Sequence, residues 1–316
     1  MEPSGQGARS TALATGSERD RAVRRVLWIV LGLNLLVAAG KLAVGTAAGA
    51  LSLIADGIHS LLDASSNIVG LVGIAAAGKP PDAEHPYGHR RFETIASVVI
   101  GLLIAGGLVE IVRRVWDGVM GEHVTPAVSW ISTAFVALTI VVNGLISRYE
   151  SRRGRELRSS ILLADAGHTF SDMLAAVAVL VSFIAVMLGV GWADLVAAAV
   201  VAVFIARTAW VILATNLGVL ADHAVLDPRA VHEIACRVPG VYGAHRIRSR
   251  GHHDHVHVDL HIHLDPELPL QRAHAKTHEV IEALRKALPE VKDVVIHTEP
   301  ADGRELDAST IAPEGD

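Results

Sequence analysis

Long apolar runs separated by short polar links fill the first two thirds of the chain. A helix needs roughly 20 consecutive apolar residues to cross the hydrocarbon core of a bilayer, and six runs are of that order. They cover about residues 26–47, 51–77, 94–115, 128–146, 160–188 and 193–215. The pattern predicts a membrane α-helical protein in which residues 24–216 form a six-transmembrane-helix bundle.

The pattern changes after residue 222, where shorter apolar segments follow one another. It predicts helices at 227–236 and 270–288 and strands at 241–250, 255–264 and 291–298. This αββαβ order is typical of a small α+β, ferredoxin-like domain, which we assign to residues 223–302. The polar ends, residues 1–23 and 303–316, predict disordered tails.

Composition supports a membrane protein. Of the 316 residues 51% are hydrophobic and only 19% are charged, which is little charge for a soluble domain of this length. The net charge of −5 gives no indication of nucleic-acid binding. The single cysteine excludes an intramolecular disulfide and a CxxC metal site.

Basic residues are concentrated in two links between the apolar runs. The link around residues 78–93 contains three Lys or Arg and that around 147–159 contains five, whereas the first-to-second and fifth-to-sixth links contain none. Because basic loops stay in the cytoplasm, both termini are predicted to be cytoplasmic, in a multi-pass protein of the cell inner (plasma) membrane. Arg113 and Arg114 oppose this orientation, but the other links outweigh them.

Two of the apolar runs carry the same polar triplet. Each member of the second triplet follows its counterpart by a constant offset (168 − 59 = 109), and the two are Asp56, His59 and Asp63, and Asp165, His168 and Asp172. Residues three and four apart share a helix face. An ionised carboxylate facing lipid is costly, so these faces must meet protein, water or an ion.

The chemistry of the repeated triplet favours a metal site over simple helix–helix contacts. Two His and two Asp, one pair from each helix, form a four-ligand set of nitrogen and oxygen that suits tetrahedral Zn²⁺. The alternative is that the polar groups only join helices inside the bundle. Asp56 and Asp165 are placed outside the four ligands, where they orient the histidines or line the ion path.

Three motifs, HSLLD, HTFSD and HPYGHRRFE, resemble the cation diffusion facilitator family of divalent-metal transporters. The resemblance runs from about residue 24 to residue 302. It implies a homodimer of six-span protomers with cytoplasmic C-terminal domains, which exchanges cytoplasmic metal for protons. It also implies a transport site of His59, Asp63, His168 and Asp172, and His at the first position of both pairs is similar to the zinc-selective members.

The resemblance extends to the link after the second run. Asp82, His85 and His89 have the spacing of the family's loop metal site, although the segment also reads as a solvated loop. With two His and one Asp, such a site leaves a coordination position open to water. Arg91 and Asp222 match a basic and an acidic residue that form an ion pair at the hinge between the two domains in the family.

The C-terminal domain is rich in histidine. In segment 255–264 His257, Asp259, His261 and His263 share one face of the predicted strand, and apolar residues fill the other. The resemblance implies a cytoplasmic metal site of His245, His261, His274, His297 and Glu299. The surplus histidines, either low-affinity capture groups or surface residues, are His252, His253, His255, His257, His263 and His278.

Together these features predict a secondary transporter, not an enzyme, that exports Zn²⁺ in exchange for protons by alternating access. Metal binding requires neutral His and ionised Asp, so it expels protons. Zn²⁺ is expected as substrate and regulatory ligand, without a prosthetic group; Fe²⁺, Mn²⁺, Co²⁺, Ni²⁺ and Cd²⁺ are alternatives. Two other classes are disfavoured: an intramembrane metallohydrolase, since the sequence has no HExxH, and a membrane metal sensor, since it has no room for an output domain.

Overall fold

The computed structural model describes residues 5–48, 57–58, 60–61, 64–120, 130–187, 192–252 and 254–301. The chain divides into two units, Met1–Leu217 and Gly218–Asp316. The division falls near the junction that the sequence predicts between residues 216 and 223. The predicted tail at 303–316 lies outside the described residues.

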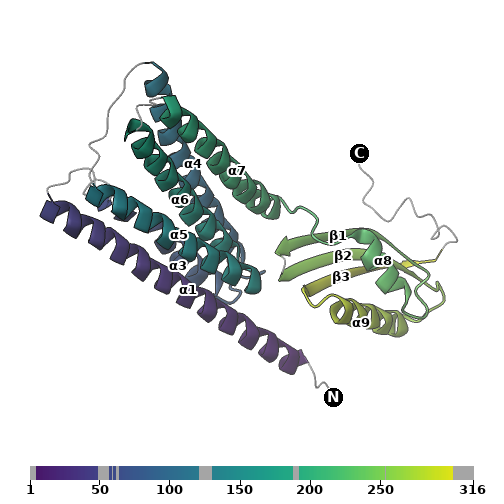
Figure 1. The fold of residues 1–316 in the computed structure, drawn as a ribbon. Coiled ribbons are helices and arrows are strands. Elements are labelled where there is room, and N and C mark those ends of the chain that lie inside the picture. Colours follow the sequence, from purple (N-terminus) through teal and green to yellow (C-terminus); the bar gives the residue numbers. More distant parts are fainter. Residues whose placement is uncertain are drawn as a thin grey trace. The chain divides into compact units, whose positions relative to one another are not determined.

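The first unit is a bundle of long helices that run side by side (Figure 1). Its helices are α1 (Gly5–Ala48), α3 (Ser65–Ala77), α4 (Arg91–Val119), α5 (Trp130–Glu156), α6 (Ser160–Met187) and α7 (Trp192–Leu220). Within the described residues four segments are long and apolar enough to cross a membrane, and they lie at Glu18–Val44, Arg91–Asp117, Ser160–Ala178 and Ala199–Leu220. The structure therefore supports a membrane-spanning helical bundle, and the predicted number of six spans stays a prediction.

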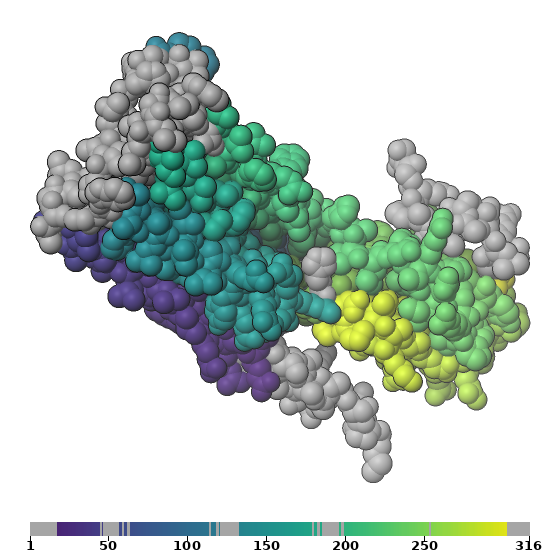
Figure 2. All heavy atoms as spheres, in the orientation of Figure 1, coloured from purple at the N-terminus to yellow at the C-terminus, as the bar shows by residue number. Residues whose placement is uncertain are grey.

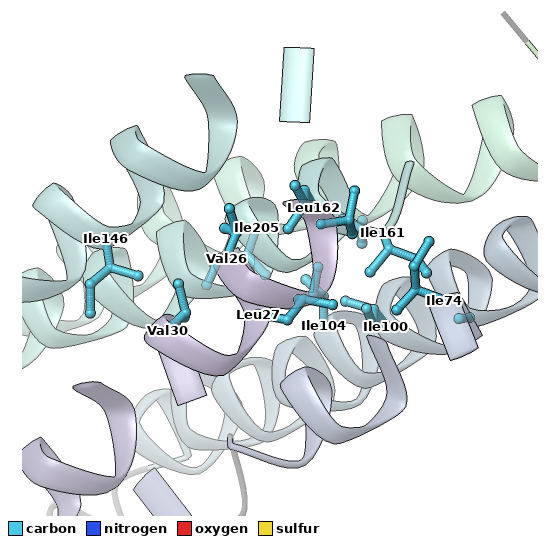
Figure 3. Close-up of a cluster of buried hydrophobic side chains, with 14 of the residues drawn as sticks. Val26, Leu27, Val30, Ile74, Ile100, Ile104, Ile146, Ile161, Leu162 and Ile205 are labelled. Atoms are coloured by element: carbon cyan, nitrogen blue, oxygen red, sulfur yellow. The ribbon is translucent and has the colours of Figure 1, made fainter. Parts of the chain in front are cut away.

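The helices of the first unit enclose an apolar core to which every one of them contributes (Figure 3). Branched aliphatic side chains dominate it, among them Val26, Leu27, Val30, Ile74, Ile100, Ile104, Ile146, Ile161, Leu162 and Ile205. Large apolar side chains also face outward, including Trp28, Trp116 and Trp210. An apolar exterior is expected of helices whose surroundings are lipid.

The N-terminal segment corrects one prediction. Residues 5–23, predicted as a disordered tail, belong to α1. Val23 is fully buried in the apolar core, and Arg19 forms ion pairs with Asp20 and with Glu93 of α4. The ion pair with Glu93 connects this polar start of α1 to α4.

The second unit has the predicted αββαβ order. It consists of α8 (Pro228–Cys236), β1 (Gly243–His252), β2 (His255–Leu264), α9 (Leu270–Ala287) and β3 (Val291–Pro300). The central strand β2 pairs antiparallel with β1 and parallel with β3. Asp227 caps α8 by accepting a hydrogen bond from the Arg229 amide, and Pro228 follows it at the first helical position.

Strand β2 separates an apolar face from a polar face, as the sequence predicts. Alternate residues from Val256 to Leu264 are buried, and the residues between them are half-exposed. The buried set packs against Val231 of α8 and Val280 and Leu284 of α9. Both helices therefore cover the apolar face, and Figure 2 shows the green-to-yellow residues of this unit as one continuous body. The histidines occupy the opposite face.

Candidate metal centres

His168 and Asp172 form one half of the predicted transport site. They lie one turn apart on α6, with 3.9 Å between His168 Nε2 and Asp172 Oδ2. Both line a cavity inside the helical unit, and polar groups from other helices line it too: Asn34 of α1, Ser60, and Thr139 and Asn143 of α5. A polar cavity with an imidazole and a carboxylate in its wall is suited to a hydrated cation.

The other half of the site, His59 and Asp63, lies outside the described residues, as does Asp56. Its neighbour Ser60 is described and lines the same cavity as His168 and Asp172. Ser60 Oγ also accepts a hydrogen bond of 2.8 Å from Nζ of Lys41, which is buried on α1. The chain next to His59 therefore borders the cavity that the second pair lines.

Asp165 is fully buried and contacts α3. Its carboxylate accepts hydrogen bonds from Ser66 Oγ, at 2.8 Å, and from Asn67 Nδ2. Asp165 therefore joins α6 to α3. The donors to its carboxylate in the described part of the chain lie on α3, and the His168 ring is not among them. A second fully buried acid, Glu150 of α5, was not predicted from the sequence. No sequence signal marked Glu150, because it lies among arginines that offered obvious partners.

The structure brings Asp82, His85 and His89 together in the loop before α4. One ligand atom from each lies within 4.8 Å of the others. Asp82 Oδ1 is 3.4 Å from His85 Nδ1, and Asp82 Oδ2 is 3.3 Å from His89 Nε2. Phe92 packs against both imidazole rings. The three side chains thus form a compact set of possible metal ligands just before the first residue of α4.

Hydrogen bonds around this loop prepare it for a cation. The His85 amide donates to Asp82 Oδ1 at 2.7 Å, and this bond lowers the pKa of the Asp82 carboxyl. His89 Nδ1 donates to the Pro80 carbonyl at 3.1 Å, which leaves the lone pair of Nε2 directed at Asp82. Two acceptors at that distance need a proton or a metal ion between them.

In the second unit, Glu299 is the centre of a histidine cluster. Its Oε1 accepts a hydrogen bond of 2.8 Å from His261 Nδ1, and its Oε2 lies 3.3 Å from Nε2 of both His245 and His263. His297 is more distant, with Nε2 3.9 Å from Oε1. The strand order explains why these side chains lie together, since β2 is the central strand. Its pairing with β1 places His261 opposite His245, and its pairing with β3 places His263 opposite Glu299.

Electrostatics in this cluster favour metal-binding protonation states. Partial burial raises the pKa of Glu299, but the hydrogen bond from His261 and the nearby imidazoles outweigh it, so the net shift is downward. Burial also lowers the pKa of His245, against the opposing effect of Glu299. An ionised carboxylate beside neutral imidazoles is the state that binds Zn²⁺.

The cluster differs in membership from the predicted site. His263, predicted as surplus, belongs to it, since with His245 and Glu299 it forms the tightest set of donors. The signal was present, because His263 shares the β2 face with His261. His274 is not brought to Glu299 within the chain, and its Nε2 instead lies 3.1 Å from Nε2 of His278 on the same face of α9.

The other surplus histidines lie around the β1–β2 hairpin. His252 Nδ1 is 3.4 Å from Asp254, and His257 Nδ1 is 3.4 Å from Asp293. The His255 ring packs near that of His257, and His253 lies outside the described residues. These contacts place a carboxylate beside the imidazoles of His252 and His257.

The two residues of the predicted hinge pair lie in different units. Arg91 is the first residue of α4. Asp222 lies 3.6 Å from Arg250 within the second unit and has a left-handed backbone conformation, with φ of 55°. The Arg91–Asp222 pair therefore stays a prediction.

Comparison with known proteins gives consistent matches over both units. Residues 27–221 match the family described as cation efflux transmembrane domain, and residues 226–301 match cation efflux protein, cytoplasmic domain. The uncharacterized transporter MJ0449 of Methanocaldococcus jannaschii is 34% identical, over 87% of this chain and 96% of its own length. The manganese efflux system protein MneP of Bacillus subtilis is 29% identical, over 90% and 98%.

A more distant relative and a solved structure add to these matches. The magnetosome protein MamB of Paramagnetospirillum magneticum is 25% identical, over 87% of this chain and 94% of its own. The solved structure MamM CTD in a copper form is 26% identical, over 24% of this chain and 84% of that chain, with a TM-score of 0.23. The full-length relatives thus cover the helical unit and the small domain together.

Proposed function

Because the chain belongs to the cation diffusion facilitator family, we propose that it exports Zn²⁺ from the cytoplasm in exchange for protons. Family membership makes it a metal efflux transporter of the membrane and not an enzyme. The proposed site consists of His59, Asp63, His168 and Asp172. The proposed assembly is a homodimer of six-span protomers in the inner membrane, with both termini in the cytoplasm.

The observation that carries this proposal is the pairing of His168 with Asp172 on a cavity that Ser60 also lines. The repeated motif then supplies an equivalent pair, His59 and Asp63, from the chain on either side of Ser60. Two imidazoles and two carboxylates suit tetrahedral Zn²⁺. Two carboxylates also neutralise a divalent cation, which lowers the cost of holding it inside the membrane.

Proton exchange follows from the same ligands. An imidazole must lose its proton before its nitrogen binds metal, and a carboxylate must be ionised. A site that faces the cytoplasm therefore releases protons as it takes up metal. When it faces outward, protonation of His59 and His168 expels the metal, since imidazoles titrate near neutral pH. The proton gradient then drives export.

The two cytoplasmic clusters have supporting roles in this proposal. The loop of Asp82, His85 and His89 offers three ligands and leaves a position for water, which suits weak capture of the ion. The cluster around Glu299 binds Zn²⁺ as a regulatory ligand and favours one arrangement of the dimer.

Metal flux in proteoliposomes tests the proposal. The full-length protein is reconstituted with a pH gradient, and uptake of Zn²⁺, Mn²⁺, Fe²⁺, Co²⁺, Ni²⁺ and Cd²⁺ is compared. Asp63→Ala and Asp172→Ala should each abolish proton-coupled Zn²⁺ flux, whereas Glu156→Ala, an exposed acid paired with Arg152, should not. Retention of Zn²⁺/H⁺ exchange in both aspartate variants would refute the site.

Manganese is the second candidate substrate, because one relative is a manganese efflux system protein. Mn²⁺ prefers oxygen ligands and higher coordination numbers, whereas the imidazoles favour Zn²⁺. Replacing His168 with Asp should therefore lower the ratio of Zn²⁺ to Mn²⁺ flux. A wild-type protein that already transports Mn²⁺ faster than Zn²⁺ would contradict the zinc assignment and leave metal efflux intact.

A further inference from the structure

Two carboxyl groups, one on α5 and one on α6, are fully buried inside the helical unit. Glu150 of α5 and Asp165 of α6 are both 0% exposed. Asp165 lies close enough to Glu150 for its charge to act on that carboxyl group. Neither has an ion pair with any Lys, Arg or His in the described part of the chain. This pair belongs to no metal-ligand set described above.

The hydrogen bonds around the pair leave one carboxyl oxygen without a donor from the described residues. Asp165 accepts from Ser66 and Asn67, and Glu150 Oε2 accepts from Thr169 Oγ1 at 3.2 Å. Glu150 Oε1 is buried and receives no hydrogen bond from the described donors. Two ionised carboxylates in contact, without a cation and away from water, are strongly unfavourable, and one proton between them removes the repulsion.

Two acids of α6 act on Glu150, and the basic residue one turn from it along α5 is Arg153, which pairs with Glu156. From α6 come Asp165 itself and Asp172, whose negative charge also acts on Glu150. From α3 come only the uncharged donors Ser66 and Asn67. The partners of the two carboxyl groups among the described residues are hydroxyls, one amide and acids, and a proton on Glu150 that donates to Asp165 satisfies the remaining acceptor.

Two short connections lead from the pair to the metal cavity. Thr169, which donates to Glu150, lines that cavity directly. On the other side Asn34 also lines the cavity and donates to Asn67 Oδ1 at 2.9 Å, and Asn67 in turn donates to Asp165. The two carboxyl groups are thus connected by hydrogen bonds to Thr169 and Asn34, which line the same cavity as His168 and Asp172.

We propose that Glu150 and Asp165 form a proton-binding site that holds one proton while the metal cavity is empty and releases it when a divalent cation binds. The arriving cation neutralises Asp172, and its field favours ionised Glu150, so one proton leaves to solvent as positive charge enters. The bound proton follows from burial alone. Its release on metal binding rests on the proposed function, because it needs the cation in the cavity.

Infrared difference spectroscopy tests for the proton itself. Full-length protein in detergent is recorded with and without Zn²⁺, and the carbonyl stretch of a protonated carboxylic acid is followed, with a shift in D₂O as its identification. Wild type should show this band, and Zn²⁺ should remove it. Glu150→Gln should lack the band, Glu150→Asp should retain it, and the exposed-site control Glu156→Gln should behave as wild type.

Calorimetry measures the released proton. Zn²⁺ binding in two buffers with different protonation enthalpies gives the number of protons released per metal, and Glu150→Gln should release about one fewer than wild type or Glu156→Gln. An unchanged number, or an unchanged infrared band, in Glu150→Gln would overturn the proposal.

A second variant keeps the test decisive if Glu150→Gln does not fold. Thr169→Val removes the donor that stabilises ionised Glu150, so the carboxylic acid band should persist to higher pH than in wild type. A band with an unchanged pH response would count against the assignment. A wild-type protein with the band but without metal transport would refute the proposed function and leave the proton site standing.

Discussion

Glu93 is expected to be the acid whose loss destabilises the helical unit most. Only 3% of it is exposed, and it binds the Arg19 guanidinium through both oxygens, each at 3.0 Å. Ser159 Oγ donates to the same carboxylate at 2.7 Å. One side chain of α4 therefore holds the N-terminal part of α1 and the start of α6. Glu93→Ala removes all three bonds and leaves Arg19 in a mostly buried site.

The structure sets the size of the effect. Removing one partner of a buried ion pair costs about 3–5 kcal/mol, because the remaining charge loses its compensation. Arg19 keeps Asp20 at 3.1 Å and the carbonyls of Leu157 and Arg158, so the lower end applies. For a unit of about this size each kcal/mol lowers Tm by roughly 2–4 °C, which predicts a decrease of roughly 6–12 °C.

Thermal unfolding in detergent, followed by tryptophan fluorescence at one fixed scan rate, measures this shift. Glu156→Ala is the matched control, since Glu156 also contacts two arginines but is 41% exposed, and exposed pairs contribute less than about 1 kcal/mol. Glu93→Gln, which keeps the shape and the Ser159 contact, should fall between the two. Equal decreases in Glu93→Ala and Glu156→Ala would refute the reasoning, because burial would then not determine the cost.

Three further outcomes are expected. Gly73→Ala makes a methyl group overlap with Ala96 Cβ and should cost about 1–3 kcal/mol in thermal stability, whereas Gly106→Ala, which meets no atom within 4 Å, should cost nothing; similar Tm values would contradict this. Glu299→Gln should weaken Zn²⁺ binding to the cytoplasmic cluster by at least about tenfold in calorimetry, and unchanged affinity would remove Glu299 from the site. Burial lowers the pKa of His245 in the folded protein. As the pH falls, the unfolded chain therefore takes up a proton at this residue before the folded protein does. The stability that His245 contributes should be present above about pH 6.5 and be lost as the pH falls below it. Urea unfolding of the metal-free protein across this range, with His245→Gln as the comparison, measures that loss, and an identical pH dependence in both would count against it.

Much of the small domain could be predicted because its signals are local. The alternation of polar and apolar residues from 255 to 264 identified β2 and its two faces, and the structure has the strand at the predicted bounds. Asp227 before Pro228 marked the start of α8. The repeated motif likewise predicted that His168 and Asp172 share a helix face, and both line one cavity, because spacing along one helix fixes which side chains share a face.

The missed features depend on contacts between segments far apart in the sequence. Arg19 and Glu93 are 74 positions apart, so nothing near Arg19 indicated that residues 5–23 would be held as helix. Glu150 and Asp165 come from different helices, and only helix packing brings the charge of one to act on the other. His263 joined the Glu299 cluster through the register of parallel strands, which the order of elements does not determine.

Strand β2 combines two requirements in one alternation, since its even-numbered residues fill the core and its odd-numbered residues form the histidine face. A substitution changes one of these faces and leaves the other intact. An insertion or deletion of a single residue would exchange them, so that imidazoles would point at α8 and α9 and aliphatic side chains at the Glu299 side. The length of this strand is therefore constrained more tightly than the identity of any one residue in it, and divergence within it is expected to proceed by replacement rather than by gain or loss of residues.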